Sequence, residues 1–111
     1  MEKIEQKKYE ARAAVLKAMA HPTRLFILDE LLKNEMCVND LSEMIDADTS
    51  TVSKHLSVLK GAGLVYTEKR SAKVFYRLRV PCIINSLSCI EKVLSLNAKE
   101  QLDLMPNQMN G

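Results

Sequence analysis

The sequence lacks any run of about 18 consecutive apolar residues, the length that a helix needs to cross a membrane, although 47% of its 111 residues are hydrophobic. Its N-terminal segment, MEKIEQKKYEARAAVLKAMA, is too highly charged and too strongly helix-forming to be a secretory signal. The length fits a single domain with one hydrophobic core. We therefore expect a cytoplasmic protein of one main domain that has no membrane partner.

Cysteine, histidine and glycine are scarce, and their scarcity excludes several classes of protein. Three cysteines, an odd number in a chain without an export signal, argue against a disulfide framework and predict free thiols. Glycine occurs only at positions 61, 63 and 111, so the sequence has no Gly-rich loop for a phosphate. His21 and His55 form no metal-binding pair, and no nucleophile elbow is present. We therefore expect no enzymatic activity and no required cofactor.

The net charge of +2 conceals an uneven distribution of charge along the chain. Residues 48–79 carry seven Lys or Arg against two Asp or Glu, whereas residues 1–47 carry seven against nine. A concentrated basic block is expected of a surface that faces a polyanion such as nucleic acid. A solvated basic face without any partner is the alternative.

The pattern of apolar residues and of helix breakers predicts a mainly α chain with one small β-hairpin. Helices are predicted at about residues 4–20, 22–34, 40–45, 49–62 and 81–96, and strands at 64–68 and 73–80. The start and stop signals are Pro22 as the first residue of the second helix, Asn39 and Asp48 as N-caps of the third and fourth, and Gly63 as a left-handed end of the fourth.

Two short helices followed by a basic hairpin define a winged helix-turn-helix. We predict that this domain spans residues 1–97 and that residues 98–111 form a partly ordered tail. A protein-interaction module that kept this fold but lost DNA binding is an alternative, and the basic block argues against it.

The fourth predicted helix has an unusual outward face. If Val52, Leu56 and Leu59 face the core, the outward residues are small hydroxyls and one cation: Thr49, Ser50, Ser53, Lys54 and Ser57. Ordinary exposed faces carry Glu–Lys pairs, whereas a small, non-acidic face can approach base edges and phosphates closely. The hairpin adds three cations, Lys69, Arg70 and Lys73, which suit either a solvated tip or a wing on DNA. We predict that this helix and this hairpin bind double-stranded DNA.

Two stretches of the chain closely resemble the ArsR/SmtB family of metal-sensing repressors. They are LKAMAHPTRLFILDELL and EMCVNDLSEMIDADTSTVSKHLSVLKGAGLVYTEKRSAKVFYRL, and the resemblance runs from about Val15 to Leu78. It implies a homodimer through the first and last helices and an effector that releases the repressor from its operator DNA. By position, it places DNA contacts at Thr49, Ser50, Ser53 and Lys54. For His55 it leaves open a DNA contact or a packed structural role, and for Arg24 a structural or a phosphate-binding role.

The segment from Glu35 to Leu41 resembles the sensor motif of this family only in part. That motif reads ELCVCDL, and this chain has EMCVNDL, so Cys37 is kept and Asn39 replaces the second cysteine. Asparagine is a poor ligand for a thiophilic ion, and the paired-thiolate form of the site is therefore broken. The last helix has no histidine, which argues against the zinc site that other family members carry there. The position of Cys37 still favours a functional role over simple packing.

Cys82 and Cys89 are the other candidate thiols, and they lie seven residues apart. Seven residues of straight helix span about 10.5 Å, whereas two thiolates on one ion lie within roughly 4.6 Å of each other. The two can share an ion only if Cys82 folds back ahead of the helix or if another thiol, such as one of the partner subunit, takes part. Packing of both cysteines in the dimer interface is an alternative.

We therefore predict a sequence-specific, homodimeric repressor that a thiol-reactive inducer releases from its operator. The candidate inducers are As(III) or a thiophilic metal ion, bound by a site drawn from Cys37, Cys82 and Cys89. The alternative is a repressor of the same family without a metal site, which responds to thiol oxidation or acts constitutively.

Overall fold

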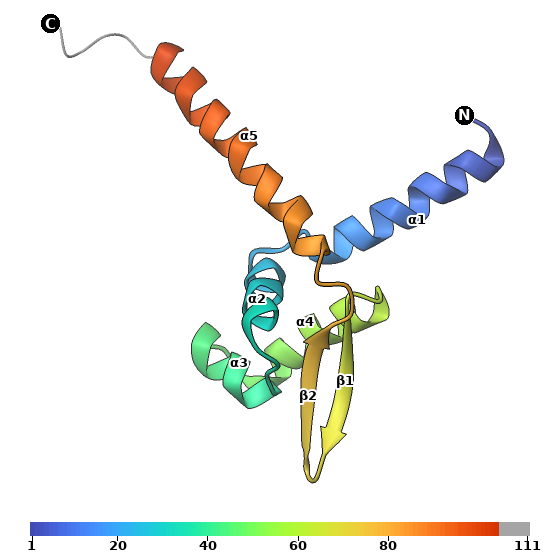
Figure 1. The fold of residues 1–111 in the computed structure, drawn as a ribbon, viewed down its shortest axis with the longest axis vertical. Coiled ribbons are helices and arrows are strands. Elements are labelled where there is room, and N and C mark those ends of the chain that lie inside the picture. Colours follow the sequence, from blue (N-terminus) through green and yellow to red (C-terminus); the bar gives the residue numbers. More distant parts are fainter. Residues whose placement is uncertain (105–111) are drawn as a thin grey trace, which may run out of the picture. The chain divides into compact units, whose positions relative to one another are not determined.

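Residues 1–104, which this computed structural model describes, form five helices and one β-hairpin. The elements in chain order are α1 (Lys3–Met19), α2 (Pro22–Lys33), α3 (Val38–Ile45), α4 (Thr49–Gly61), β1 (Val65–Arg70), β2 (Lys73–Leu78) and α5 (Ile83–Leu104), as labelled in Figure 1. This order confirms the predicted fold class, a mainly α winged helix-turn-helix with a small hairpin. No described helix is long and apolar enough to cross a membrane.

The predicted signals at the ends of α2 and α4 are confirmed. Pro22 is the first residue of α2, and the Nδ1 atom of His21 accepts a hydrogen bond from the Thr23 N–H at 3.1 Å. The carboxylate of Asp48 caps α4 by accepting a hydrogen bond from the Thr51 N–H at 2.7 Å. Gly63 has a φ of 80°, a left-handed conformation that favours glycine and that lets the chain leave α4 for β1.

The start of α3 differs from the prediction, because its N-cap is Cys37 and not Asn39. A backbone bridge fixes the preceding residue to the hairpin: the Met36 N–H donates to the Tyr76 carbonyl at 3.2 Å, and the Tyr76 N–H donates to the Met36 carbonyl at 2.8 Å. The helix therefore begins directly after this bridge. Asp40 then lies in the first turn, where its carboxylate accepts a hydrogen bond from the Cys37 N–H at 3.2 Å.

The last helix begins and ends later than predicted, at Ile83 and Leu104 instead of about residues 81 and 96. The segment Ala98–Gln101 consists of strong helix formers, which extend α5 by continued backbone hydrogen bonding. Of the predicted tail at residues 98–111, residues 98–104 are thus helical, and the rest lies outside the described residues. The described residues divide into two compact units, with the boundary between Pro81 and Cys82.

The core of the first unit fixes the orientation of α4. Its largest fully buried side chains come from α2, α3 and α4: Ile27, Leu28, Leu41, Val52, Leu56 and Leu59. The three from α4 are the residues predicted to face inward. Burying a side chain of this size contributes about 1.5–3 kcal/mol, so α4 is held with its opposite face in solvent.

Candidate nucleic-acid interface

The outward face of α4 is formed as the sequence predicts. Thr49, Ser50, Lys54 and Ser57 are exposed, and Ser53 is half-buried. Ser50 also takes part in the N-cap, since its hydroxyl donates a hydrogen bond to the Asp48 carboxylate at 2.9 Å. The hydrogen bonds from Thr51 and then from Ser50 lower the pKa of Asp48 below its ordinary value. The face therefore offers small hydroxyls and one cation, while the Thr51 N–H is already occupied by the cap.

His55 points from α4 into a cluster of polar side chains. Its Nδ1 atom lies 3.3 Å from Nη1 of Arg24, and its ring centroid lies 4.5 Å from that of His21. Arg24 is fixed in turn, because its Nε–H donates to the Ala18 carbonyl at 2.6 Å. Burial, with the nearby charges of His21 and Arg24, lowers the pKa of His55. These contacts give Arg24 a structural role and hold His55 in a packed position, and a contact of His55 with DNA stays a prediction.

The register of the hairpin separates its cations. Arg70 pairs with Lys73 across the strands, and Lys69 pairs with Val74. Directly opposed residues of an antiparallel pair share a face, and successive residues alternate between faces. Arg70 and Lys73 therefore lie on one face of the wing, and Lys69 lies on the other.

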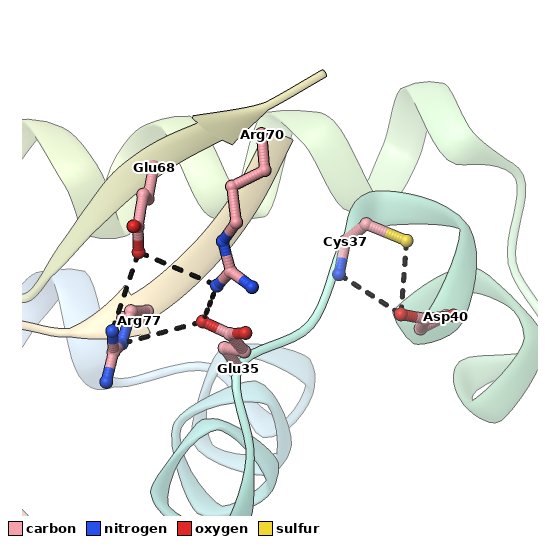
Figure 2. A network of polar contacts seen from close by, with 6 residues as sticks. All are labelled: Glu35, Cys37, Asp40, Glu68, Arg70 and Arg77. Carbon is pink, nitrogen blue, oxygen red and sulfur yellow. Dashed lines mark hydrogen bonds and ion pairs between the residues drawn. The ribbon is translucent and has the colours of Figure 1, made fainter. Parts of the chain in front are cut away.

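Arg70 and Arg77 are held in an ion-pair network with two carboxylates (Figure 2). Arg70 pairs with Glu35 and lies 3.6 Å from the Glu68 carboxylate, and Arg77 lies 3.7 Å from Glu35 and 3.5 Å from Glu68. The guanidinium of Arg70 also lies over the ring of Phe75, 4.5 Å from its centroid. The hydrogen bond to Glu35, followed by the charges of both carboxylates, raises the pKa of Arg70.

This network determines which cations of the interface are free of ion pairs with the protein's own carboxylates. Within residues 1–104, no ion pair occupies Lys54, Lys69 or Lys73, whereas Arg70 is engaged by protein carboxylates. Sequence reasoning missed Glu35 and Arg77 as parts of this surface. The strand register could have brought Arg77 to the same face as Glu68 and Arg70, but the position of Glu35 depends on the Met36–Tyr76 bridge.

Cys37 is hydrogen-bonded at the start of α3, beside the wing. Its thiol donates to the Asp40 carboxylate at 3.1 Å, and its backbone N–H donates to the same oxygen, as Figure 2 shows. These two bonds, and more weakly the charge of Lys73, lower the pKa of Asp40. A cleft of about 260 Å³ lies here, lined by residues 37–40 and 72–74. Cys37 thus lies at the start of α3 and lines a cleft together with residues 72–74 of the hairpin.

Cys82 and Cys89 are exposed in the second unit, and the Cys89 thiol lies 3.7 Å from the Asn85 carbonyl. All three cysteines are free thiols in this structure. Across residues 1–104 of one chain, no group of three or more His, Cys, Asp or Glu side chains is arranged to hold a metal ion. A site that combines Cys37, Cys82 and Cys89 stays a prediction.

The geometry described so far defines a winged helix-turn-helix DNA-binding protein, with a hydroxyl-rich helix and a basic hairpin on one domain. Residues 21–67 match the family described as bacterial regulatory protein, arsR family. The transcriptional activator HlyU of Vibrio cholerae is 47% identical over 75 residues, which cover 67% of this chain and 69% of that protein. The chain belongs to the ArsR family of DNA-binding transcriptional regulators, and the predicted family is confirmed.

Solved structures agree with this assignment. NolR from Sinorhizobium fredii has a TM-score of 0.77 and 31% identity, and the match covers 84% of this chain and 93% of NolR. A homodimeric winged helix-turn-helix DNA-binding domain from Mycobacterium bovis has a TM-score of 0.74 and 25% identity, over 86% of this chain and 88% of that one. Both likenesses support the winged helix-turn-helix fold of this chain.

Proposed function

We propose that the protein is a homodimeric repressor that inserts α4 of each subunit into the major groove of a double-stranded operator. The observation that carries this proposal is the outward face of α4, where Thr49, Ser53 and Lys54 form a small, non-acidic surface on a helix fixed by the core. Hydroxyl groups both donate and accept, so such a face can read base edges and bind phosphates. We place the protein in the cytoplasm, because a protein that binds genomic DNA and carries free thiols fits that compartment.

Two observations support the homodimer. The Mycobacterium bovis neighbour is described as homodimeric, and α5 exposes a row of apolar side chains that includes Ile90, Val93 and Leu94. An exposed apolar row of this kind is typical of a surface that a second copy buries. A two-fold dimer would read two half-sites about one helical turn, or a multiple of it, apart.

The DNA-binding proposal is tested by two variants on an operator selected from a random duplex library and on a random-sequence duplex. Lys73→Ala should weaken binding to both duplexes. It should also reduce the slope of the logarithm of the observed binding constant, Kobs, against the logarithm of the salt concentration by about one unit, because one phosphate contact is lost. Ser53→Ala should lower the preference for the operator over the random duplex. An unchanged salt slope removes Lys73 from the phosphate contacts, and unchanged discrimination removes Ser53 from sequence reading.

For the inducer, we propose a thiol-reactive species, As(III) or a thiophilic metal ion, that binds Cys37 together with Cys82 or Cys89. The support is the cap at α3: binding of the Cys37 sulfur would remove the proton that it donates to Asp40, 3.1 Å away. The start of α3 would lose that contact next to the Met36–Tyr76 bridge that holds the wing. Oxidation of the same thiols would have the same local effect, and it is the alternative that we keep.

The inducer proposal is tested by anaerobic ultraviolet titration of the reduced protein with arsenite, cadmium and zinc in turn. Saturating thiolate–metal absorption that is lost in Cys37→Ser supports the site, and Cys82→Ser and Cys89→Ser show which second thiol takes part. Absence of absorption with every ion rejects metal binding. Release from DNA by a mild oxidant, reversed by a thiol reductant, then favours the redox alternative.

An activator is the second candidate, because HlyU, 47% identical to this chain, is described as a transcriptional activator. The two candidates differ in the response of the target promoter. Deletion of the gene raises expression of a reporter behind the selected operator if the protein represses, and lowers it if the protein activates.

A further inference from the structure

Glu35 forms ion pairs with two basic residues of the wing, Arg70 and Arg77. It lies in the connection between α2 and α3, and its carboxylate contacts both Arg70 and Arg77. Glu68 contacts the same two arginines from β1. Two carboxylates thus face two guanidinium groups, and this face of the wing is close to neutral around Arg70 and Arg77 (Figure 2).

The backbone fixes Glu35 independently of its ion pairs. The next residue, Met36, exchanges two hydrogen bonds with Tyr76 of β2, so Glu35 is held beside the hairpin. Arg70 is further oriented by the Phe75 ring beneath it. The side chains of Arg70 and Arg77 remain about half exposed, at 47% and 50%. DNA phosphates could reach both arginines, and Glu35 competes with those phosphates.

We infer that Glu35 sets how many cations the wing offers to DNA: it withholds Arg70 and Arg77 from phosphates, so that Lys69 and Lys73 act as the cations of the wing. The inference rests on the proposed DNA-binding function. Binding to random DNA is mainly electrostatic and independent of sequence. Neutralising two arginines therefore weakens this electrostatic part of binding to any duplex, while the base contacts of α4, which distinguish the operator, are left unchanged.

This role also changes one of the sequence-based predictions. The sequence predicts that Arg70 contacts DNA. Under the present inference, Arg70 instead pairs with Glu35 and helps to orient the wing. An exposed ion pair contributes little to stability, so removal of one partner should leave the fold intact. Loss of Glu35 should then show in the salt dependence of DNA binding and not chiefly in stability.

The test measures Kobs against salt for random and selected operator duplexes, with wild type, Glu35→Gln, Arg70→Ala and the double variant. Glu35→Gln should steepen the slope on random DNA by up to about one unit for each arginine released. A slope that is steeper by one unit corresponds to an additional gain in affinity of about fourfold for each fourfold drop in salt. Arg70→Ala alone should leave the slope unchanged, and in the Glu35→Gln background it should reverse part of the increase.

Glu43→Gln is the matched control, because Glu43 is exposed on α3 and makes no ion pair among the described residues. It makes the same change of net charge and should steepen the slope less than Glu35→Gln does. A flatter slope in Arg70→Ala, or equal slopes in Glu35→Gln and wild type, overturns the inference. Wild-type protein that binds operator and random DNA equally well overturns the proposed function instead.

Discussion

His55 connects α4 to the first two helices through polar contacts in a region where α4 otherwise packs with apolar side chains. Nη1 of Arg24 lies 3.3 Å from the His55 ring, and the His21 ring lies beside it. A proton on His55 would add a positive charge next to Arg24 in a half-buried place. The neutral ring is therefore favoured, and the lowered pKa of His55 expresses this preference.

We predict that the protein loses stability as the pH falls below about 6.5, the ordinary pKa of histidine. Below that pH, His55 is protonated in the unfolded chain but stays neutral in the folded chain. The free energy of unfolding therefore falls until the pH reaches the lower pKa of folded His55. Urea denaturation at a series of pH values measures this change. In His55→Gln the fall should be smaller.

The two capping carboxylates do not interfere with this test. The pKa values of Asp40 and Asp48 are lowered from 3.8, so their stabilising contributions are complete above that pH and are lost only when the pH falls through the lowered values. Identical pH profiles for wild type and His55→Gln would show that His55 is not the group responsible.

At the scale of elements, the corner between α4 and β1 depends on one backbone conformation. Gly63 has a φ of 80°, and a Cβ atom placed there would lie 2.8 Å from Nη1 of Arg79. That guanidinium is the end of a flexible side chain and can move. The main cost of a side chain at position 63 is therefore the left-handed backbone itself.

We predict that Gly63→Ala lowers the free energy of unfolding by about 1–2 kcal/mol. Gly61→Ala is the control: Gly61 lies in α4, and an added Cβ meets nothing within 4 Å. In this helical position alanine should stabilise by up to about 1 kcal/mol. The two variants therefore shift the denaturation midpoint in opposite directions, and shifts of the same sign would contradict this account of the corner.

The boundaries marked by Pro22 and Asp48 could be predicted from the sequence, whereas the start of α3 and the end of α5 could not. The starts of α2 and α4 follow from Pro22 and Asp48 alone. The start of α3 was placed two residues late, because it is set by the bridge from Met36 to Tyr76 in a distant part of the chain. The end of α5 lies beyond the predicted one, because the helix formers after Leu96 continue the helix instead of forming a tail.

The same distinction holds for the candidate site. The outward face of α4 follows from helical spacing once Val52, Leu56 and Leu59 are assigned to the core. The engagement of Arg70 could not be seen in the basic block, because Glu35 reaches it only through the fold. Counting cations in the sequence therefore overestimates the charge that the wing can offer to DNA.

At the scale of the whole molecule, the proposed dimer makes the exposed apolar row of α5 a requirement for DNA binding. We predict that Leu94→Asp, at a side chain that is 60% exposed in one chain, shifts the protein toward monomers and weakens operator binding. An aspartate buried in an apolar interface leaves its charge without a partner. Sedimentation velocity and operator titration measure the two effects.

Ser95→Asp is the control for this prediction, because it places the same charge on the next residue of α5, outside the row that includes Ile90, Val93 and Leu94. It should leave both the dimer and operator binding nearly unchanged. A dimeric Leu94→Asp variant that binds its operator normally would move the interface away from this row.

The bridge between Met36 and Tyr76 gives β2 a neighbour on each side at that point, while β1 pairs only with β2 among the described residues. An open outer strand is a template on which another chain can add a strand of its own, the first step toward aggregation. The outer strand here ends in Glu68, Lys69 and Arg70, and consecutive charges hinder such pairing. These three charged residues at the end of β1 therefore also help to keep separate molecules from joining edge to edge at high concentration.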